Sequence, residues 1–261
     1  MPGSQRQLRN MPERNLFINQ YQRQSQRLDQ LLPWMQQARA ESRQQILAQG
    51  PPVQNSEYWK YCRVDDFLFT SSDTQENASP DATVQSETEG YTRAWDIETA
   101  INVGIPGTVF SPKKPGALPE GLTISQFSDG DTDSMAILNR YFNQNLSDLA
   151  PQAKYRLSSI NTSMLSDGLL IHVKKGVTIS PILNLQIQPK GYQRLLVVLE
   201  PGSSLRIVEQ IPADHDENGH LNYTVECVLE PDSKLQHSRI QGKSNTSEYT
   251  LTTTQLGHRA D

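Results

Sequence analysis

Val198-Leu-Glu-Pro-Gly-Ser-Ser-Leu205 recurs 30 residues later as Val228-Leu-Glu-Pro-Asp-Ser-Lys-Leu235. A weaker copy, Val173-Lys-Lys-Gly-Val-Thr-Ile179, lies 25 residues before the first of these two. Each copy joins two apolar segments through a tight turn, and such a unit repeated at this period is typical of a solenoid, in which each turn of chain buries its apolar face on the next. The repeat therefore favours a β-helix, and a meander or sandwich with similar turns is the alternative.

The chain from residue 160 onward is predicted to be mainly β. Its segments are rich in Leu, Ile, Val and Thr and are bounded by Gly, Pro, Asp and Ser, as expected of strands joined by turns. Because only a few residues follow the last segment, we expect that segment to leave an unpaired edge and an exposed apolar interior. The expected strands are Leu169–Val173, Leu183–Gln188, Leu195–Leu199, Leu205–Glu209, Tyr223–Leu229, Leu235–Ile240 and Tyr249–Gln255.

A helical arm is predicted in front of these strands. Residues 1–50 are rich in Gln and Arg, and their apolar residues follow a helical spacing. This pattern predicts a weak helix over about 13–31 and a second over about 33–49, ended by Gly50 and two prolines. Pro33 is tolerated because it falls in a first turn. A further helix is expected to begin near Ser134.

Composition divides the chain into three regions. Residues 1–69 form the helical arm. Residues 70–121 form a linker and loop, because 70–90 hold five acids with no Lys or Arg and 104–121 hold four Pro and four Gly. Residues 122–261 hold a helical lead-in and the β core.

Charge and hydropathy exclude several classes of protein. Residues 1–50 carry seven Arg against three acids, about +4, and the rest carries 17 basic against 26 acidic residues, about −9. This balance argues against a nucleic-acid binder, and no apolar run is long enough to span a membrane. The two cysteines, Cys62 and Cys227, and the lack of a secretory segment favour a reduced, cytoplasmic protein.

No catalytic, cofactor-binding or metal-binding residue is assigned. Phosphate-binding glycine loops and the common hydrolase and zinc motifs are absent from the sequence. His215 and His220 flank an acidic Asn-Gly turn, for which a polar turn is the simpler explanation than a metal site. Cys227 lies two residues from both Val225 and Leu229, so the alternation of a strand places it on their apolar face, which indicates a core residue. We therefore assign no bound cofactor.

Glu57-Tyr58-Trp59-Lys60-Tyr61 is predicted to be a structural and assembly anchor, with Glu57, Trp59, Lys60 and Tyr61 as its residues. The rings are expected to hold the end of the arm against the body, while Lys60 pairs with Glu57 or stacks on a ring. A docking surface for a partner is the alternative.

Three blocks resemble the SufD family of iron–sulfur cluster assembly scaffolds, in the right order. The first is Ile46–Pro52 together with Glu57–Tyr61, which is similar to the family's Gly-Pro and Glu-x-Trp-Lys-Tyr signature with Cys62 where Thr is common. The second is Ser159–Val173 with its Asp167-Gly168 pair, and the third is Val228–Gln241.

The resemblance implies a right-handed parallel β-helix, partial in this chain, behind the helical arm. It also implies a scaffold subunit that is not an enzyme and that acts with a SufB-like protein and a SufC-like ATPase, with the iron–sulfur cluster assembled by the complex. Family members usually continue well past residue 261, so we expect a fragment or truncated product. The alternatives are a β-helix carbohydrate-active enzyme and a degenerate scaffold remnant.

Overall fold

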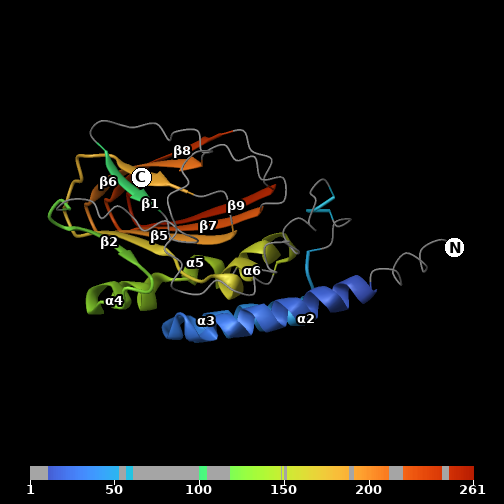
Figure 1. Ribbon diagram of the computed structural model, residues 1–261. Helices are drawn as coiled ribbons and strands as arrows, with labels where there is room; N and C mark the ends of the chain where they lie inside the picture. Colours follow the sequence, from blue (N-terminus) through green and yellow to red (C-terminus); the bar gives the residue numbers. More distant parts are fainter. Residues whose placement is uncertain are drawn as a thin grey trace, which may run out of the picture.

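The repeated segments fold into strands that alternate between two sheets (Figure 1). The computed structural model describes residues 11–52, 57–60, 100–104, 118–147, 149, 152–187, 191–211, 220–242 and 247–261. Within these residues the four-stranded sheet has the order β1 (Ile101–Gly104), β4 (Leu183–Gln186), β6 (Ser204–Ile211) and β8 (Lys234–Gln241). The five-stranded sheet has the order β2 (Leu122–Gln126), β3 (Leu169–Val173), β5 (Gly191–Leu199), β7 (His220–Leu229) and β9 (Ser247–Leu256).

Each strand from β3 onward pairs in parallel with the strand two places later in the chain. The parallel strands expected from the repeat are therefore confirmed, and the right-handed β-helix stays a prediction. β2, which the sequence analysis missed, pairs antiparallel with β3 and begins the sheet. Its five residues mix polar and apolar side chains, so they carried no clear strand pattern.

The turns of the repeated segments stack on one another. Gly176 and Gly202 have φ of 70° and 71°, and Asp232 has φ of 62° at the matching place in the next copy. This left-handed conformation favours glycine, and Asp is among the few other residues that tolerate it. The change from Pro-Gly to Pro-Asp between the two copies therefore leaves the turn intact.

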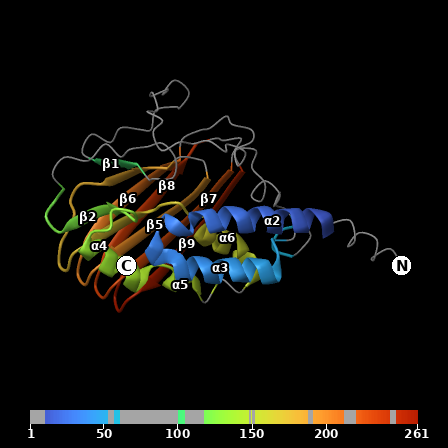
Figure 2. The same cartoon turned by 60° about the horizontal axis from the view of Figure 1, so that its bottom comes forward.

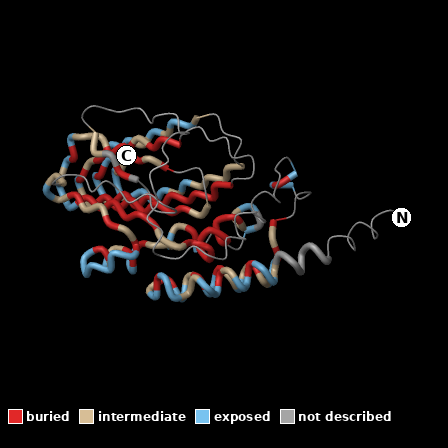
Figure 3. Tube along the Cα trace, viewed as in Figure 1, coloured by how far each residue is buried: buried red, intermediate tan, exposed pale blue. Residues whose placement is uncertain are grey.

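The apolar core lies between the two sheets. Strand residues at alternate positions point into it, and the rows match across each parallel pair, as for Ile171, Val197 and Cys227. β7 is buried along its whole length, because helices cover the outer face of the five-stranded sheet (Figure 3). Burial on both faces explains its nearly continuous apolar and small-polar sequence.

The interior becomes polar toward β8 and β9, which corrects the expected apolar end. The register aligns the core-facing Tyr223, Val225 and Cys227 with Thr250, Thr252 and Thr254 of β9. On the other sheet, Ile207 aligns with His237. The strand at β9 was predicted because its segment is rich in β-branched residues. Threonine meets that criterion, but its hydroxyl group does not make an apolar face.

The arm is an antiparallel helical hairpin that lies outside the five-stranded sheet (Figure 2). It consists of α2 (Met11–Arg27), η1 (Leu28–Gln30), η2 (Pro33–Met35) and α3 (Gln36–Gln49). Pro33 opens η2 and Gly50, with φ of 77°, ends α3, so the predicted break and end are confirmed. The remaining helices are α4 (Thr132–Tyr141), α5 (Gln144–Ser147), η5 (Ala153–Tyr155) and α6 (Arg156–Met164).

The prediction of a mainly β chain is right only in part, because helices also make up a large share of the described residues. The sequence analysis missed α6 altogether. Its sequence, RLSSINTSM, is rich in residues with low helix propensity, and its short apolar stripe of Leu157, Ile160 and Met164 was overlooked. It forms because it fills the space between the hairpin and the sheet, where eight of its residues, Leu157–Met164, are buried.

Several predictions fall on residues outside those described. They include the linker 70–90, most of the loop 104–121, Tyr61 and His215. The three proposed regions of the chain stay predictions. No described helix has both the length and the apolar character needed to cross a bilayer.

Gly168 tests the packing where β3 begins. A Cβ atom at this position would lie 2.4 Å from Cε2 of Phe127, whose ring is buried under α4. We expect Gly168→Ala to lower the free energy of unfolding by about 1–3 kcal/mol, measured by urea denaturation. Adding Phe127→Leu should recover part of this loss, because it removes the clashing ring atoms. A double variant less stable than the sum of the two single changes would contradict the explanation.

Candidate functional site

The residues of the predicted anchor lie in different environments in the structure. Trp59 is 6 % exposed, and its ring centroid lies 6.0 Å from that of Tyr249 on β9. It belongs to an apolar cluster that joins the hairpin, through Tyr21 and Ile46, to α6. Glu57 and Lys60 are exposed, and Tyr61 lies outside the described residues. Trp59 thus lies where arm, α6 and β9 meet, and the role of the four residues in assembly stays a prediction.

A fully buried ion pair lies on the outer face of the five-stranded sheet. Arg194 on β5 and Glu226 on β7 approach to 2.6 Å, and both side chains are 0 % exposed. The backbone N–H of Asn143 donates to the same Glu226 oxygen at 3.0 Å, and the Asn143 side-chain oxygen accepts from Arg194 at 3.2 Å. Asn143 has φ of 63° and joins α4 to α5. The ion pair therefore fixes the link between these helices on the sheet.

Side-chain amides continue this buried network beneath α6. Asn161 donates to the backbone oxygens of Gln193 and Asn222 at 3.0 and 2.8 Å. The Asn222 amide donates in turn to the Leu157 carbonyl at 2.8 Å. These bonds satisfy polar groups that water cannot reach, which is the condition for burying them at low cost. The network holds α6 in place, and its groups are engaged with one another.

A second buried carboxylate lies inside the core, near its polar end. Glu209 on β6 accepts from Tyr223 Oη at 2.8 Å and from Arg239 Nε at 2.6 Å, and His237 Nε2 lies 3.0 Å away. Burial alone would raise the pKa of Glu209. The hydrogen bond and charge of His237, together with Arg239, outweigh burial and hold that pKa below its ordinary value. The cluster thus carries an ionised carboxylate between the two sheets.

Cys227 points into the same region of the core. Burial, with a contribution from the Glu209 charge, raises the pKa of its thiol to about 12. The side chain is 1 % exposed. A thiol of this kind stays protonated and is a poor nucleophile or metal ligand at neutral pH. The predicted core position of Cys227 is confirmed.

The described histidines are dispersed. His220 is buried against the ring of Tyr192 at 5.2 Å, and His172 lies 3.0 Å from Glu200 at the end of its strand. In the described part of the chain, no group of three or more His, Cys, Asp or Glu side chains is arranged to hold a metal ion.

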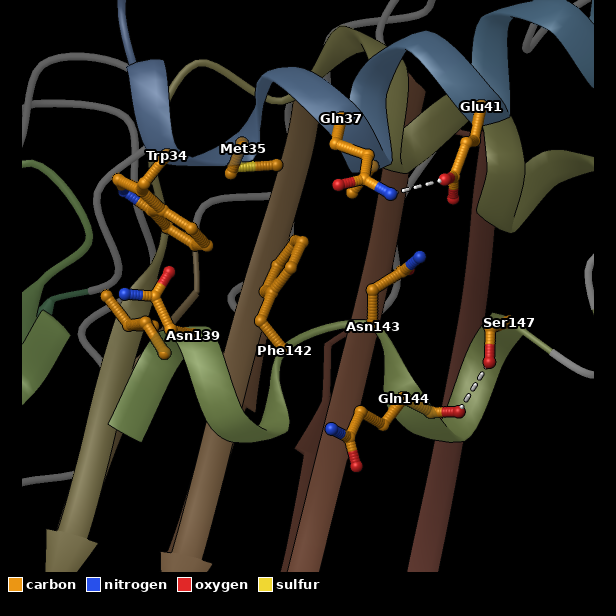
Figure 4. A pocket seen from close by; sticks show the side chains of 11 residues that line it. Trp34, Met35, Gln37, Glu41, Asn139, Phe142, Asn143, Gln144 and Ser147 are labelled. Carbon is orange, nitrogen blue, oxygen red and sulfur yellow. Dashed lines mark hydrogen bonds between the residues drawn. The ribbon is translucent and has the colours of Figure 1, made fainter. Parts of the chain in front are cut away.

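A groove of about 310 Å³ separates the hairpin from α4 and α5 (Figure 4). Two aromatic rings, Trp34 and Phe142, meet edge to face at its end, 5.1 Å apart. Its polar side chains are partly paired within the groove, as when Gln37 donates to Glu41 at 2.9 Å. The groove offers amides and ring edges, which suits contact with neutral polar groups and not acid–base chemistry. Its lining residues are Trp34, Met35, Gln37, Ala38, Glu41, Leu138, Asn139, Phe142, Asn143, Gln144 and Ser147.

The sequence analysis missed the buried charges that organise these sites. Arg194 and Glu209 each lie inside a strand whose neighbours are mostly apolar. A charged residue within such a segment is rarely buried unless it is paired, so both positions signalled a buried partner. The partners, Glu226 and Arg239, lie on other strands and could be identified only from the register.

Comparison with known proteins gives a consistent result along the chain. Residues 11–185 match the SufBD protein N-terminal region, and residues 185–261 match the SufBD core domain of the SUF system for FeS cluster assembly. The two matches meet within β4. An iron–sulfur cluster assembly SufBD family protein of Staphylococcus saprophyticus is 27 % identical over 130 residues, which cover 47 % of this chain. The chain spans 28 % of the length of that relative.

The buried ion pair can be tested by a double-mutant cycle. Arg194→Met and Glu226→Leu should each lower the free energy of unfolding by about 3–5 kcal/mol, because each leaves a buried charge without its partner. The double variant should lose clearly less than the sum of the two, as measured by urea denaturation. The exposed ion pair of Arg259 with Asp232 provides a control, and Arg259→Met should cost at most about 1 kcal/mol. Additive losses at Arg194 and Glu226 would contradict the coupling.

The Glu209 cluster predicts a dependence on pH. Because folding lowers the pKa of Glu209 from 4.5, its stabilisation is complete above that value and is lost as pH falls through the lower folded value. Glu209→Gln should therefore be less stable than wild type near neutral pH, and the gap should narrow in acid. Urea denaturation at several pH values measures it. Asp167→Asn is the contrasting control, because burial raises the Asp167 pKa and reverses the sign. If the stability difference from wild type changed with pH in the same direction for both variants, the lowered pKa of Glu209 would be contradicted.

Proposed function

This chain belongs to the SufB/SufD family of the SUF iron–sulfur cluster assembly system, and we propose that it acts there as a SufD-like scaffold subunit. The observation that carries the proposal is the pair of family matches, which together extend over residues 11–261. The Glu-x-Trp-Lys-Tyr anchor and the Asp167-Gly168 block add support for the SufD branch. The iron–sulfur cluster is the cargo of the assembled complex in this proposal, and no residue of this chain is assigned as its ligand.

A scaffold role, without enzymatic activity, is supported by the way the buried charges are used. Glu209 and Glu226 are both 0 % exposed, and each is held by an arginine. Catalytic carboxylates must reach a substrate, whereas these two connect strands and helices. Cys227 is buried as a protonated thiol. Each of these groups thus stabilises the framework on which a partner can be positioned.

The winding of strands supports a right-handed parallel β-helix as the framework. From β3 onward, consecutive strands alternate between the sheets, and residues 257–261 cross back to the four-stranded sheet after β9. There the backbone N–H of Asp261 donates to the carbonyl of Ser233, just before β8, at 3.0 Å, and its carbonyl accepts from the N–H of Leu235 in β8 at 2.7 Å. Each crossing therefore repeats the one before it, as successive turns of a solenoid do.

The proposed partners are a SufB-like scaffold protein and a SufC-like ATPase, in the cytoplasm. β8 and β9 are the last strands of their sheets among the described residues, and their outer edges carry backbone groups able to pair with a further strand. The polar interior at this end makes such an edge compatible with a wet interface. A carbohydrate-active β-helix enzyme is the less favoured alternative, because the buried acids Glu209 and Glu226 are engaged in ion pairs.

Co-expression tests the proposed function. The full chain carrying an affinity tag would be produced with the SufB-like and SufC-like proteins of the same organism, and the captured material would be analysed by native mass spectrometry. We expect a complex of defined stoichiometry that contains this chain. The matched comparison is the variant Arg194→Met. It removes the ion pair that fixes the α4–α5 link on the sheet, and this should reduce recovery of the complex. A folded wild-type chain that elutes alone would refute the proposal.

A further inference from the structure

The positive charge of the arm is confined to its N-terminal part. Residues 1–27 contain five Arg and one acid, about +4, whereas residues 28–50 contain two Arg and two acids and have no net charge. The whole positive excess of the arm therefore precedes η1. The remaining chain is acidic, about −9.

The two arginines of α3 are used in packing. Arg39 is 0 % exposed and donates to the carbonyls of Leu28 and, at 2.8 Å, of Leu165. Arg43 pairs with Asp29 and donates to the Ser25 carbonyl at 3.1 Å. These bonds close the hairpin and join it to the loop before β3. The positive charges of Arg39 and Arg43 are thus not available to a partner.

The described arginines of α2 have a different setting. Arg23 and Arg27 are exposed, lie four residues apart on one face, and form no ion pair with any residue in the described ranges of the chain. Residues three and four apart on a helix are neighbours, so the two guanidinium groups can act together. The same face carries uncharged amides at Gln22, Gln26 and Gln30, all exposed.

The apolar side of α2 is already occupied. Tyr21 is 3 % exposed and its hydroxyl lies 2.5 Å from Ser163 Oγ of α6, in the cluster that contains Trp59. Between residues 19 and 27 every exposed side chain of α2 is polar, so this part of the outward face has no apolar stripe. Figures 1 and 2 both show the hairpin of α2 and α3 on the outside of the molecule, beside the other helices.

We propose that the Arg23–Arg27 face of α2 is a docking surface for an acidic segment of a partner protein. Guanidinium groups bind carboxylates through paired hydrogen bonds, and glutamine amides can donate to further carboxylate or backbone oxygens. A helix or loop that presents Asp or Glu at a matching spacing fits this face. Two guanidinium groups on a chain of net charge −5 supply few of the phosphate contacts on which nucleic-acid binding rests, and the exposed residues of α2 between 19 and 27 form no apolar stripe for a membrane surface.

The test uses the full chain and a fluorescent polyglutamate peptide of about 20 residues. Binding would be followed by fluorescence anisotropy at low salt and again at high salt, where exposed charge pairs are screened. We expect saturable binding that weakens with salt, and Arg23→Glu/Arg27→Glu should weaken it at least about fivefold. The matched control is Lys174→Glu/Lys175→Glu, which changes the charge equally at two exposed positions far from the arm in sequence. This control should change the affinity by less than about twofold.

Three further results would overturn the proposal. The first is a lack of saturable binding of the peptide. Equal weakening by both double variants would count in the same way, because overall charge would then explain the effect. The second is tighter binding of single-stranded DNA, or of vesicles containing phosphatidylserine, than of the peptide. The third is a mass, by light scattering, that doubles at low salt only when Arg23 and Arg27 are present, because the occupant would then be a second copy. Circular dichroism of each variant checks the fold. No SUF subunit takes part, so the outcome is independent of the co-expression experiment.

Discussion

Burial of β7 on both faces is the constraint on which the rest of the structure depends. Its inner row packs in the core between the sheets, and its outer row lies beneath helices, so none of its ten residues is exposed. Burying a charged or amide side chain in this position is costly unless it is hydrogen-bonded. Glu226 and Asn222 therefore require Arg194 and Asn161, and those partners determine where α4, α5 and α6 lie. The hairpin is placed in turn, because it packs on α6.

This chain of dependence is well suited to a scaffold. The buried pair Arg194–Glu226 joins neighbouring strands to the α4–α5 link, and Arg39 joins the hairpin to the loop that leads into β3. Buried ion pairs add little net stability, but their directional bonds permit few alternative arrangements. A family whose members work by positioning partners gains more from a defined geometry than from an accessible reactive group. The exposed Arg23–Arg27 face and the edges of β8 and β9 are the surfaces left for such partners.

The interior also changes along the direction in which the strands stack. It is aliphatic at β3 and β4, acquires Glu209 at β6, and by β8 and β9 carries His237, Arg239 and a row of threonines. Glu209 stays ionised there because His237 and Arg239 compensate for its burial. The interior next to the last described strands is thus polar, and a strand stacked on them would not have to be strongly apolar.

The sequence by itself determined the local features whose causes are local. The repeated Val-Leu-Glu-Pro turns, the break at Pro33 and the stop at Gly50 follow from backbone preferences, and the seven predicted strands follow from apolar runs between turns. The residues that carry the family resemblance could likewise be recognised from the sequence. Only the tertiary structure decided which side chains share a site. Arg194 and Glu226 are 32 residues apart in sequence. α6 is rich in residues of low helix propensity, and the polarity of the last interior row depends on the register of β9. The physical reason is that pairing and burial are non-local: a charge or a serine-rich helix is stable only where distant parts of the chain satisfy its polar groups.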